Sequence, residues 1–383
     1  MIEPQMLIDH ASIAPLPAPF WFVQFFKWLG FTLHAVPMNL WYAGLLVALW
    51  LHLRGNEQAR RFGDRLLRQM PIIVAVGVNL GVVPLLFVQL AYPKVFYPAT
   101  ILMAWFWLAI IGLLTVAYYG VYAYAWGIRN GTKNMAGWRL MAGWCAALLF
   151  IAIGFCFANG LSLTEHVARW PELWQRHSTA GAAWGTALNV GDPTFWARWL
   201  LMFGLALGTT AVWALVDAFW LAGKTADDAY GQWALGFARK LYTLSLVWTA
   251  AAGTWYVFGT WPEELRKTML SWPLLGFPYN VLTIVTGAAI GLPWLLVMTA
   301  PWWRSKRALA ALAFLAQFGV LGINAASRQV VQNSNLKPFF DVAAVPEHVQ
   351  WGPLVMFLVV FVIGLALVAW MLGQAMKAPS PKQ

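Results

Sequence analysis

The chain has 383 residues, of which 61% are hydrophobic and only 10% are charged, and its mean hydropathy is +0.64. A soluble globular domain needs far more charge on its surface, so this composition excludes that class and indicates an integral membrane protein. The net charge of +11 would suit a nucleic-acid partner, but the charges are distributed along the chain in a way that argues against one.

The first twenty residues carry only Glu3 and Asp9 as charges and lack the basic region and cleavage site of a signal peptide. We therefore expect the first apolar segment to be an uncleaved span. Nine segments are apolar and long enough to cross a bilayer, namely 21–53, 70–92, 98–127, 137–160, 194–222, 233–258, 279–301, 307–325 and 350–376. These segments predict an all-α fold, a polytopic transmembrane bundle of about nine helices that forms one integral membrane domain over residues 1–383.

The basic residues predict the orientation of this bundle. The connections after spans one, three, five and seven, together with the C-terminal tail, hold sixteen of the 25 Lys and Arg residues but only four acids. The opposite face is balanced, with nine of each. The positive-inside rule makes the basic face cytoplasmic, with the N-terminus outside and the C-terminus in the cytoplasm of a bacterial-type cytoplasmic membrane. The positive charge thus reports topology and contact with membrane lipid rather than nucleic acid.

The outside face is expected to carry loops at 161–193 and 326–349 that are rich in aromatic residues and poor in charge. One interpretation is a docking surface for a redox partner such as a c-type cytochrome, since interface centres favour aromatic side chains. Its candidate contacts are Trp170, Trp174, Arg328 and Phe339. The alternative is that these aromatics form the interfacial belt and face lipid headgroups.

His34 is the one histidine placed within the membrane, in the segment FTLHAVPMNLWYAG. A neutral imidazole that faces a helical bundle is the usual ligand of b-type haem iron, so His34 is the candidate cofactor and metal ligand. The alternative is a histidine that hydrogen-bonds across a helix interface. No C-x-x-C-H motif is present, which excludes a c-type haem, and no catalytic residue can be assigned.

We expect no Glu, Lys or Arg deep in a span, and Asp217 is placed in the cytoplasmic half of its span. Transporters that couple to protons or ions need chains of such groups, so a transporter or channel is disfavoured. Phosphate-binding loops and zinc motifs are absent from the sequence as well.

Four short motifs resemble subunit I of the cytochrome bd-type quinol oxidase superfamily, in a divergent branch that lacks the long quinol loop. They are His34-Ala35-Val36-Pro37 in the first span, Gly77-Val78-Asn79-Leu80-Gly81 in the second, Phe157-Ala158-Asn159-Gly160 ending the fourth and Ser327-Arg328-Gln329 ending the eighth. The resemblance implies a nine-span bundle with its N-terminus outside. It also assigns haem ligation to His34.

Several of the residues that family uses have no counterpart here. Its glutamate ligand falls on Ala325, its histidine in the fifth span is missing from 198–203, and 278–281 contains no ligand methionine. A three-haem oxygen-reducing site cannot be assembled, so the chain is not expected to be a complete oxygen reductase by itself.

These features favour a membrane subunit of a respiratory electron-transfer complex. It would hold one b-type haem on His34, or contact quinone near the outside face, and exchange electrons with a partner. As an enzyme it would be an oxidoreductase subunit. The alternative is a haem-free anchor or scaffold for a catalytic redox subunit, and self-association into a homo-oligomer is left open.

Overall fold

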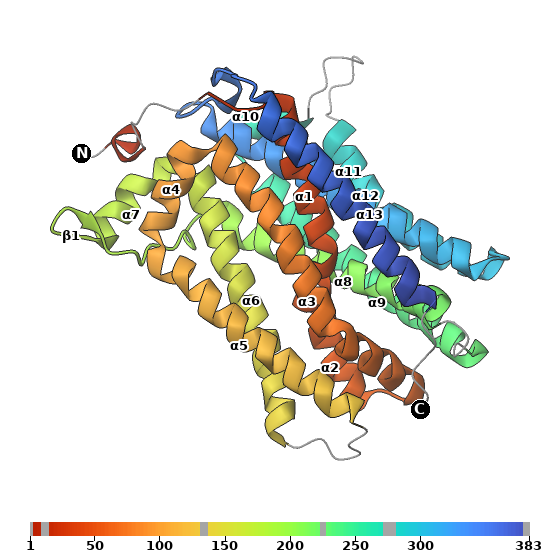
Figure 1. The fold of residues 1–383 in the computed structure, drawn as a ribbon. Helices are drawn as coiled ribbons and strands as arrows, with labels where there is room; N and C mark the ends of the chain where they lie inside the picture. The colour runs from red at the N-terminus through yellow and green to blue at the C-terminus, as the bar shows by residue number, and fades with distance from the viewer. Residues whose placement is uncertain (1–2, 9–14, 131–136, 223–226, 271–280, 378–383) are drawn as a thin grey trace.

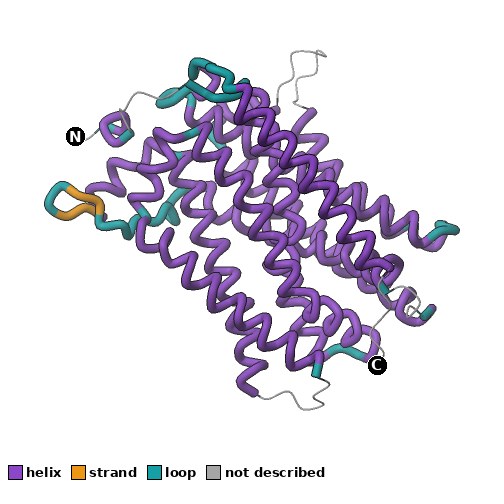
Figure 2. Tube along the Cα trace, in the orientation of Figure 1, coloured by secondary structure: helices purple, strands orange, loops and turns teal. Residues whose placement is uncertain are grey.

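The computed structural model describes residues 3–8, 15–130, 137–222, 227–270 and 281–377. Long helices run side by side along most of the molecule, and the strands in the described part form one short hairpin (Figures 1 and 2). This all-α bundle confirms the predicted fold class.

The helices are α1 (Phe20–Asn39), α2 (Leu45–Arg54), α3 (Glu57–Ala91), α4 (Pro93–Leu102), α5 (Ala104–Arg129), α6 (Gly137–Glu165), α7 (Trp170–His177), α8 (Pro193–Val216), α9 (Asp228–Thr254), α10 (Glu263–Leu270), α11 (Val281–Met298), α12 (Lys306–Leu336) and α13 (Trp351–Lys377).

Within the described residues, six helical segments are long and apolar enough to cross a membrane. They are Phe20–Arg54, Glu57–Ala91, Ala104–Arg129, Gly137–Glu165, Pro193–Leu221 and Lys306–Leu336. The chain is therefore a multi-pass membrane protein. Helices α9, α11 and α13 occupy the other three predicted spans, and the total of nine crossings stays a prediction.

Two helices extend beyond their predicted ends and shorten the expected outside loops. Helix α6 continues to Glu165 and α12 to Leu336, so 161–165 and 326–336 are helical rather than loop. The cause is that polar side chains at these helix ends face other helices instead of water. The rest of the first loop folds into η3 (Val167–Arg169), α7 and the hairpin of β1 (Ser178–Thr179) and β2 (Ala182–Ala183).

Three long helices contain a wider π-helical turn. These turns are η2 (Leu40–Gly44), which joins α1 to α2, η4 (Asp217–Leu221) at the end of α8, and η6 (Trp255–Thr260) at the end of α9. Pro37 lies inside α1, three residues before η2 begins. Such turns are frequent at functional sites. The turn η6 supplies Tyr256 and Phe258 to the wall of a cavity.

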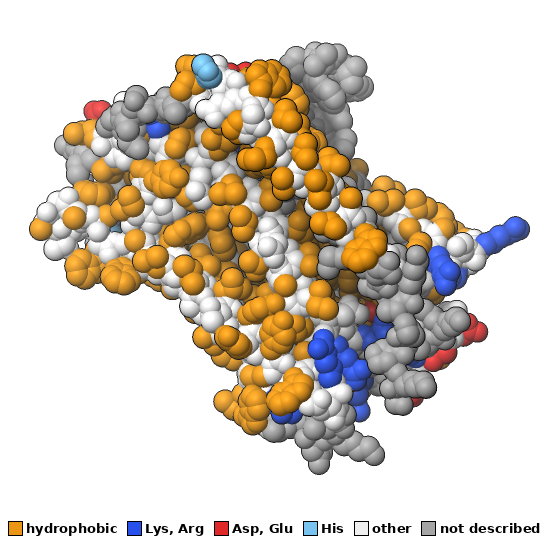
Figure 3. Space-filling view, viewed as in Figure 1, with side chains coloured by type: hydrophobic (Ala, Val, Ile, Leu, Met, Phe, Trp, Pro, Cys, Tyr) orange, Lys and Arg blue, Asp and Glu red, His pale blue; other side chains and the backbone are white. Residues whose placement is uncertain are grey.

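Charged side chains gather at one end of the bundle. Lys and Arg cluster there in the space-filling view, whereas apolar side chains cover the middle (Figure 3). Arg65 donates to both oxygens of Asp217 at 2.7 and 3.0 Å, and Tyr230 donates to the same carboxylate at 2.6 Å. The Tyr230 backbone N–H and Arg61 both bind Asp227, which holds the pKa of that carboxyl below its ordinary value. Figure 1 places η1 (Pro4–Leu7), α7 and the hairpin at the opposite end.

Candidate functional site

His34 lies on α1 and faces α3. Its Nδ1 is 2.7 Å from the carbonyl oxygen of Gly77, so Nδ1 carries the proton and donates it to that carbonyl. The imidazole lies against the bare Cα of Gly81, because a Cβ there would approach its Cε1 to 2.7 Å. The ring of Trp41 meets it edge-on, with centroids 5.6 Å apart. The histidine is thus fixed in one tautomer, with Nε2 unprotonated.

The donor chemistry of His34 fits a b-type haem. Histidines that bind metal ions commonly donate their second ring N–H to a backbone carbonyl, as His34 does to Gly77. The two cavities described below do not include His34 in their walls. Among the described residues, no group of three or more His, Cys, Asp or Glu could hold a metal ion. A single imidazole could hold haem iron, and His34 could do so through its Nε2.

A buried ion pair lies at the end of the bundle opposite the basic face. Arg198 at the start of α8 donates to Glu165 at the end of α6, and their side chains are only 7% and 6% exposed. The amide of Asn335 donates to the second oxygen of Glu165 at 2.9 Å. A buried pair is costly to desolvate, and a further hydrogen bond offsets part of that cost. The pair joins α6, α8 and α12, which lie far apart in the sequence.

A buried lysine accompanies this pair. Lys27 on α1 is 6% exposed and donates to Tyr92 at 2.8 Å and to Gln332 at 3.0 Å. The Tyr92 hydroxyl in turn lies 2.6 Å from Asn333. These partners are neutral, so Lys27 is held by hydrogen bonds to uncharged side chains instead of by a carboxylate. No Lys was expected deep in a span, but Lys27 is buried within the first predicted span, 21–53.

Arg328 on α12 lies between two cavities. Its guanidinium is 4.8 Å from the ring centroid of Phe31, a cation–π contact. The smaller cavity, of about 70 Å³, lies between α1, α3, α6 and α12, and Lys27, Glu165 and Ala325 also line it. The motif resemblance places the family's glutamate ligand at Ala325. Lys27, Glu165 and Arg328 instead supply the charged groups in that cavity.

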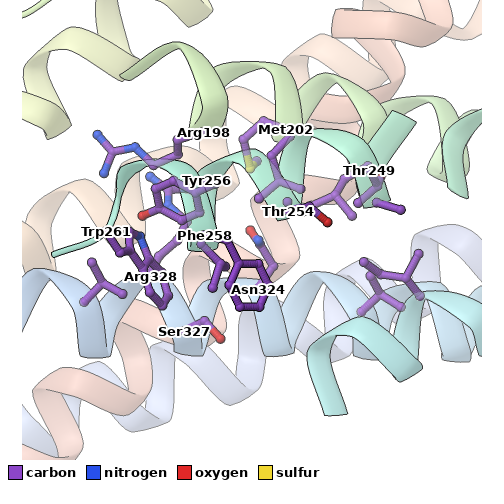
Figure 4. Close-up of a pocket in the computed structure, with 18 of the residues that line it drawn as sticks. Arg198, Met202, Thr249, Thr254, Tyr256, Phe258, Trp261, Asn324, Ser327 and Arg328 are labelled. Carbon is purple, nitrogen blue, oxygen red and sulfur yellow. The ribbon is translucent and has the colours of Figure 1, made fainter. Parts of the chain in front are cut away.

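The larger cavity has a volume of about 290 Å³ and lies between α8, α9 with η6, α11 and α12. In Figure 4, Arg198, Tyr256, Trp261 and Arg328 lie toward one end, and Thr249 and Thr254 toward the other. The π-turn η6 supplies Tyr256 and Phe258 to this wall. Most of the remaining wall is apolar and comes from Leu201, Met202, Leu205, Leu246, Val257, Ile290, Val320 and Val331.

The four candidate docking residues are not all on the surface. Trp170 is fully buried and donates from Nε1 to the Leu163 carbonyl at 2.9 Å, so it cannot contact a partner. Arg328 is half-buried and lines both cavities. The assignment of Trp170 was wrong because its ring packs inward, whereas a partner contact at Arg328 stays a prediction. Trp174 and Phe339 are half-buried and pack against the core.

Sequence reasoning missed Lys27, Glu165 and Arg198. Lys27 interrupts the run FVQFFKWLGF, and a lysine with apolar neighbours on both sides signals an enclosed charge. Glu165 was assigned to the outside loop at 161–193, and Arg198 falls at the start of the fifth predicted span. No local pattern shows that they meet, because 33 positions separate them.

Comparison with known proteins identifies the architecture. No protein-family model matches the chain, and no curated protein matches its sequence. A solved structure does match, that of the bd oxidase from Geobacillus thermodenitrificans, with a TM-score of 0.69 and 14% sequence identity over 95% of this chain and 99% of that chain. The chain has the bd oxidase fold. This confirms the distant resemblance seen in the four motifs, and at 14% identity the match establishes the fold alone.

Proposed function

We propose that this chain is the membrane subunit of a respiratory electron-transfer complex in a bacterial-type cytoplasmic membrane, and that His34 holds one b-type haem. The observation that carries the proposal is the tautomer of His34. Because Nδ1 donates to Gly77, Nε2 is left without a proton and its lone pair could bind iron. A bound b haem would supply one-electron transfer.

The same fold allows contact with quinone near the outside face, as well as a partner such as a c-type cytochrome on that face. The chain's own contribution is to position and isolate the redox group. His34 orients it, Gly77 and Gly81 hold the imidazole, and the surrounding apolar helices exclude water. Ala325 has no ligating atom and 198–203 contains no histidine, so oxygen reduction is not assigned to this chain alone.

The second candidate function is a haem-free anchor or scaffold for a catalytic redox subunit. The packing of His34 favours this scaffold function. The imidazole lies against Gly81, and neither described cavity includes His34 in its wall. In this reading His34 only ties α1 to α3 through its bond to Gly77.

A spectrum of the purified chain separates the two functions. We expect a b-type reduced-minus-oxidised spectrum in the wild type and its loss in His34→Ala, because the only proposed iron ligand is removed. The matched control is His52→Ala, which removes a histidine that binds Asp64 at the other end of the bundle. A colourless wild-type protein, made with adequate haem, would establish the scaffold instead. An unchanged spectrum in His34→Ala would exclude His34 as the ligand.

A further inference from the structure

Two buried polar atoms on side chains that line the larger cavity have no hydrogen-bond partner among the described residues. Arg198 Nη2 and Thr249 Oγ1 both belong to side chains that line it, and both atoms are buried without a hydrogen-bond partner in the described part of the chain. Leaving a buried donor unpaired costs about 1–3 kcal/mol, and more for a charged group. An arginine that is 6% exposed and keeps an unpaired N–H beside a cavity is therefore a place where an acceptor would bind.

The charge around this end of the cavity is unbalanced. Of the two arginines that line this end, Arg198 is paired with Glu165, which leaves the positive charge of Arg328 in excess. Glu165 is already bound by Arg198, and Asp192 accepts from the backbone and hydroxyl of Thr194. No carboxylate of the described residues forms an ion pair with Arg328. Residues 271–280, which lie outside the described part, contain no charged side chain.

The rest of the wall is apolar and reaches the surface of the bundle. Phe258 lines the cavity and is 58% exposed, and Ala250 and Thr254 also belong both to the wall and to the outer surface. These residues lie along α9 and η6, on helices that cross the membrane in the predicted topology. An occupant can therefore place a charged group at the arginine end and leave an apolar tail in the bilayer.

We propose that this cavity binds the anionic headgroup of a membrane amphiphile that carries a single negative charge. Arg198 and Arg328 bind its phosphate or carboxylate oxygens, and Thr249 is a further donor along the wall. At about 290 Å³ the cavity is near the lower limit for small-molecule sites, so it takes the headgroup and the first part of an acyl chain. The site is independent of haem at His34, which contributes nothing to this wall.

The test uses the full chain, purified in mild detergent with any subunits that accompany it. Bound lipids are identified by native mass spectrometry. The delipidated protein is then titrated with phosphatidylglycerol, with phosphatidylcholine of the same acyl chains, and with oleate, and its Tm is measured. We expect a monoanionic lipid to remain bound and phosphatidylglycerol or oleate to raise Tm. A shift with phosphatidylglycerol assigns a phosphate headgroup, and one with oleate alone assigns a carboxylate.

Two variants test the location. Arg328→Gln should weaken binding at least about tenfold, since a hydrogen bond to a charged group is lost. Gly253→Met leaves every charge in place but fills the cavity, because a Cβ at Gly253 makes only ordinary contact with Leu201 at 3.6 Å. It should abolish binding even if Arg328→Gln does not fold. The control is Arg304→Gln, which removes an exposed arginine outside this cavity.

Three results would overturn the proposal. The first is an equal Tm shift with phosphatidylcholine, or no shift with any of the lipids. The second is full retention of the anionic lipid in Gly253→Met. The third is recovery of a quinone, and no anionic lipid, as the molecule whose binding Arg328→Gln and Gly253→Met remove.

Discussion

At the scale of single residues, position along a helix could be predicted but partners could not. His34 was recognised because an ionisable side chain stands out in an apolar segment. Its acceptor, the carbonyl of Gly77, is a backbone group 43 positions away and carries no sequence signal. The pairing of Glu165 with Arg198 could not be predicted either, because the two residues lie 33 positions apart.

Glu165→Gln should be among the most damaging single substitutions in the chain. Removing one partner of a buried ion pair leaves Arg198 charged and uncompensated, which costs about 3–5 kcal/mol of unfolding free energy. The measurement is the thermal unfolding of the variant in detergent. Glu172→Gln is the control, because Glu172 forms exposed pairs with Arg169 and Arg176 that are each worth less than about 1 kcal/mol. An equal loss of thermal stability in the two variants would contradict this prediction.

At the scale of helices, apolar runs located the spans. Helices α6 and α12, however, continue through polar residues that were taken as loop. Helix α12 was expected to end at residue 325 because Ser327, Arg328 and Gln332 follow. In the structure Arg328 lies against Phe31 and Gln332 accepts from Lys27, so both face the bundle interior. Composition alone cannot separate a polar loop from a polar face that other helices cover.

Gly81→Ala should disturb the contact between α1 and α3. The new Cβ would approach His34 Cε1 to 2.7 Å, and displacing the imidazole from Gly77 is expected to cost about 1–3 kcal/mol. Thermal unfolding and the haem spectrum are the two readouts, and both should weaken. Gly112→Ala on α5 is the matched control, since nothing lies within 4 Å of its Cβ position. A Gly81→Ala protein as stable and as coloured as the wild type would contradict the described packing of His34.

At the scale of the whole molecule, the segregation of charge was the strongest signal in the sequence. The structure shows Lys and Arg collected at one end of the bundle (Figure 3), while the buried Lys27 and Arg198 and the half-buried Arg328 lie toward the other. The orientation itself stays a prediction, because it depends on the positive-inside rule. The bd oxidase architecture could be inferred only from weak motifs, since at 14% identity the likeness lies mainly in helix arrangement.

Accessibility of single cysteines tests the orientation. After replacement of Cys145 and Cys156, cysteines at Arg60 and Arg304 should resist a membrane-impermeant thiol reagent in intact cells, whereas cysteines at Arg176 and Lys337 should react. All four positions are exposed in the structure, so burial does not explain protection. Permeabilised cells provide the control, in which every position should label. The opposite pattern in intact cells would reverse the topology and move the proposed partner to the other face.

The most direct test of an electron-transfer function is reduction of the haem by a physiological class of donor. The purified complex is mixed without oxygen with a quinol or with a reduced c-type cytochrome, and its b-type absorbance is followed. The account predicts that one of these donors reduces the haem in the wild type and that His34→Ala shows no such signal. A b-type haem that dithionite reduces but neither donor does would contradict it, as would a wild-type complex without haem.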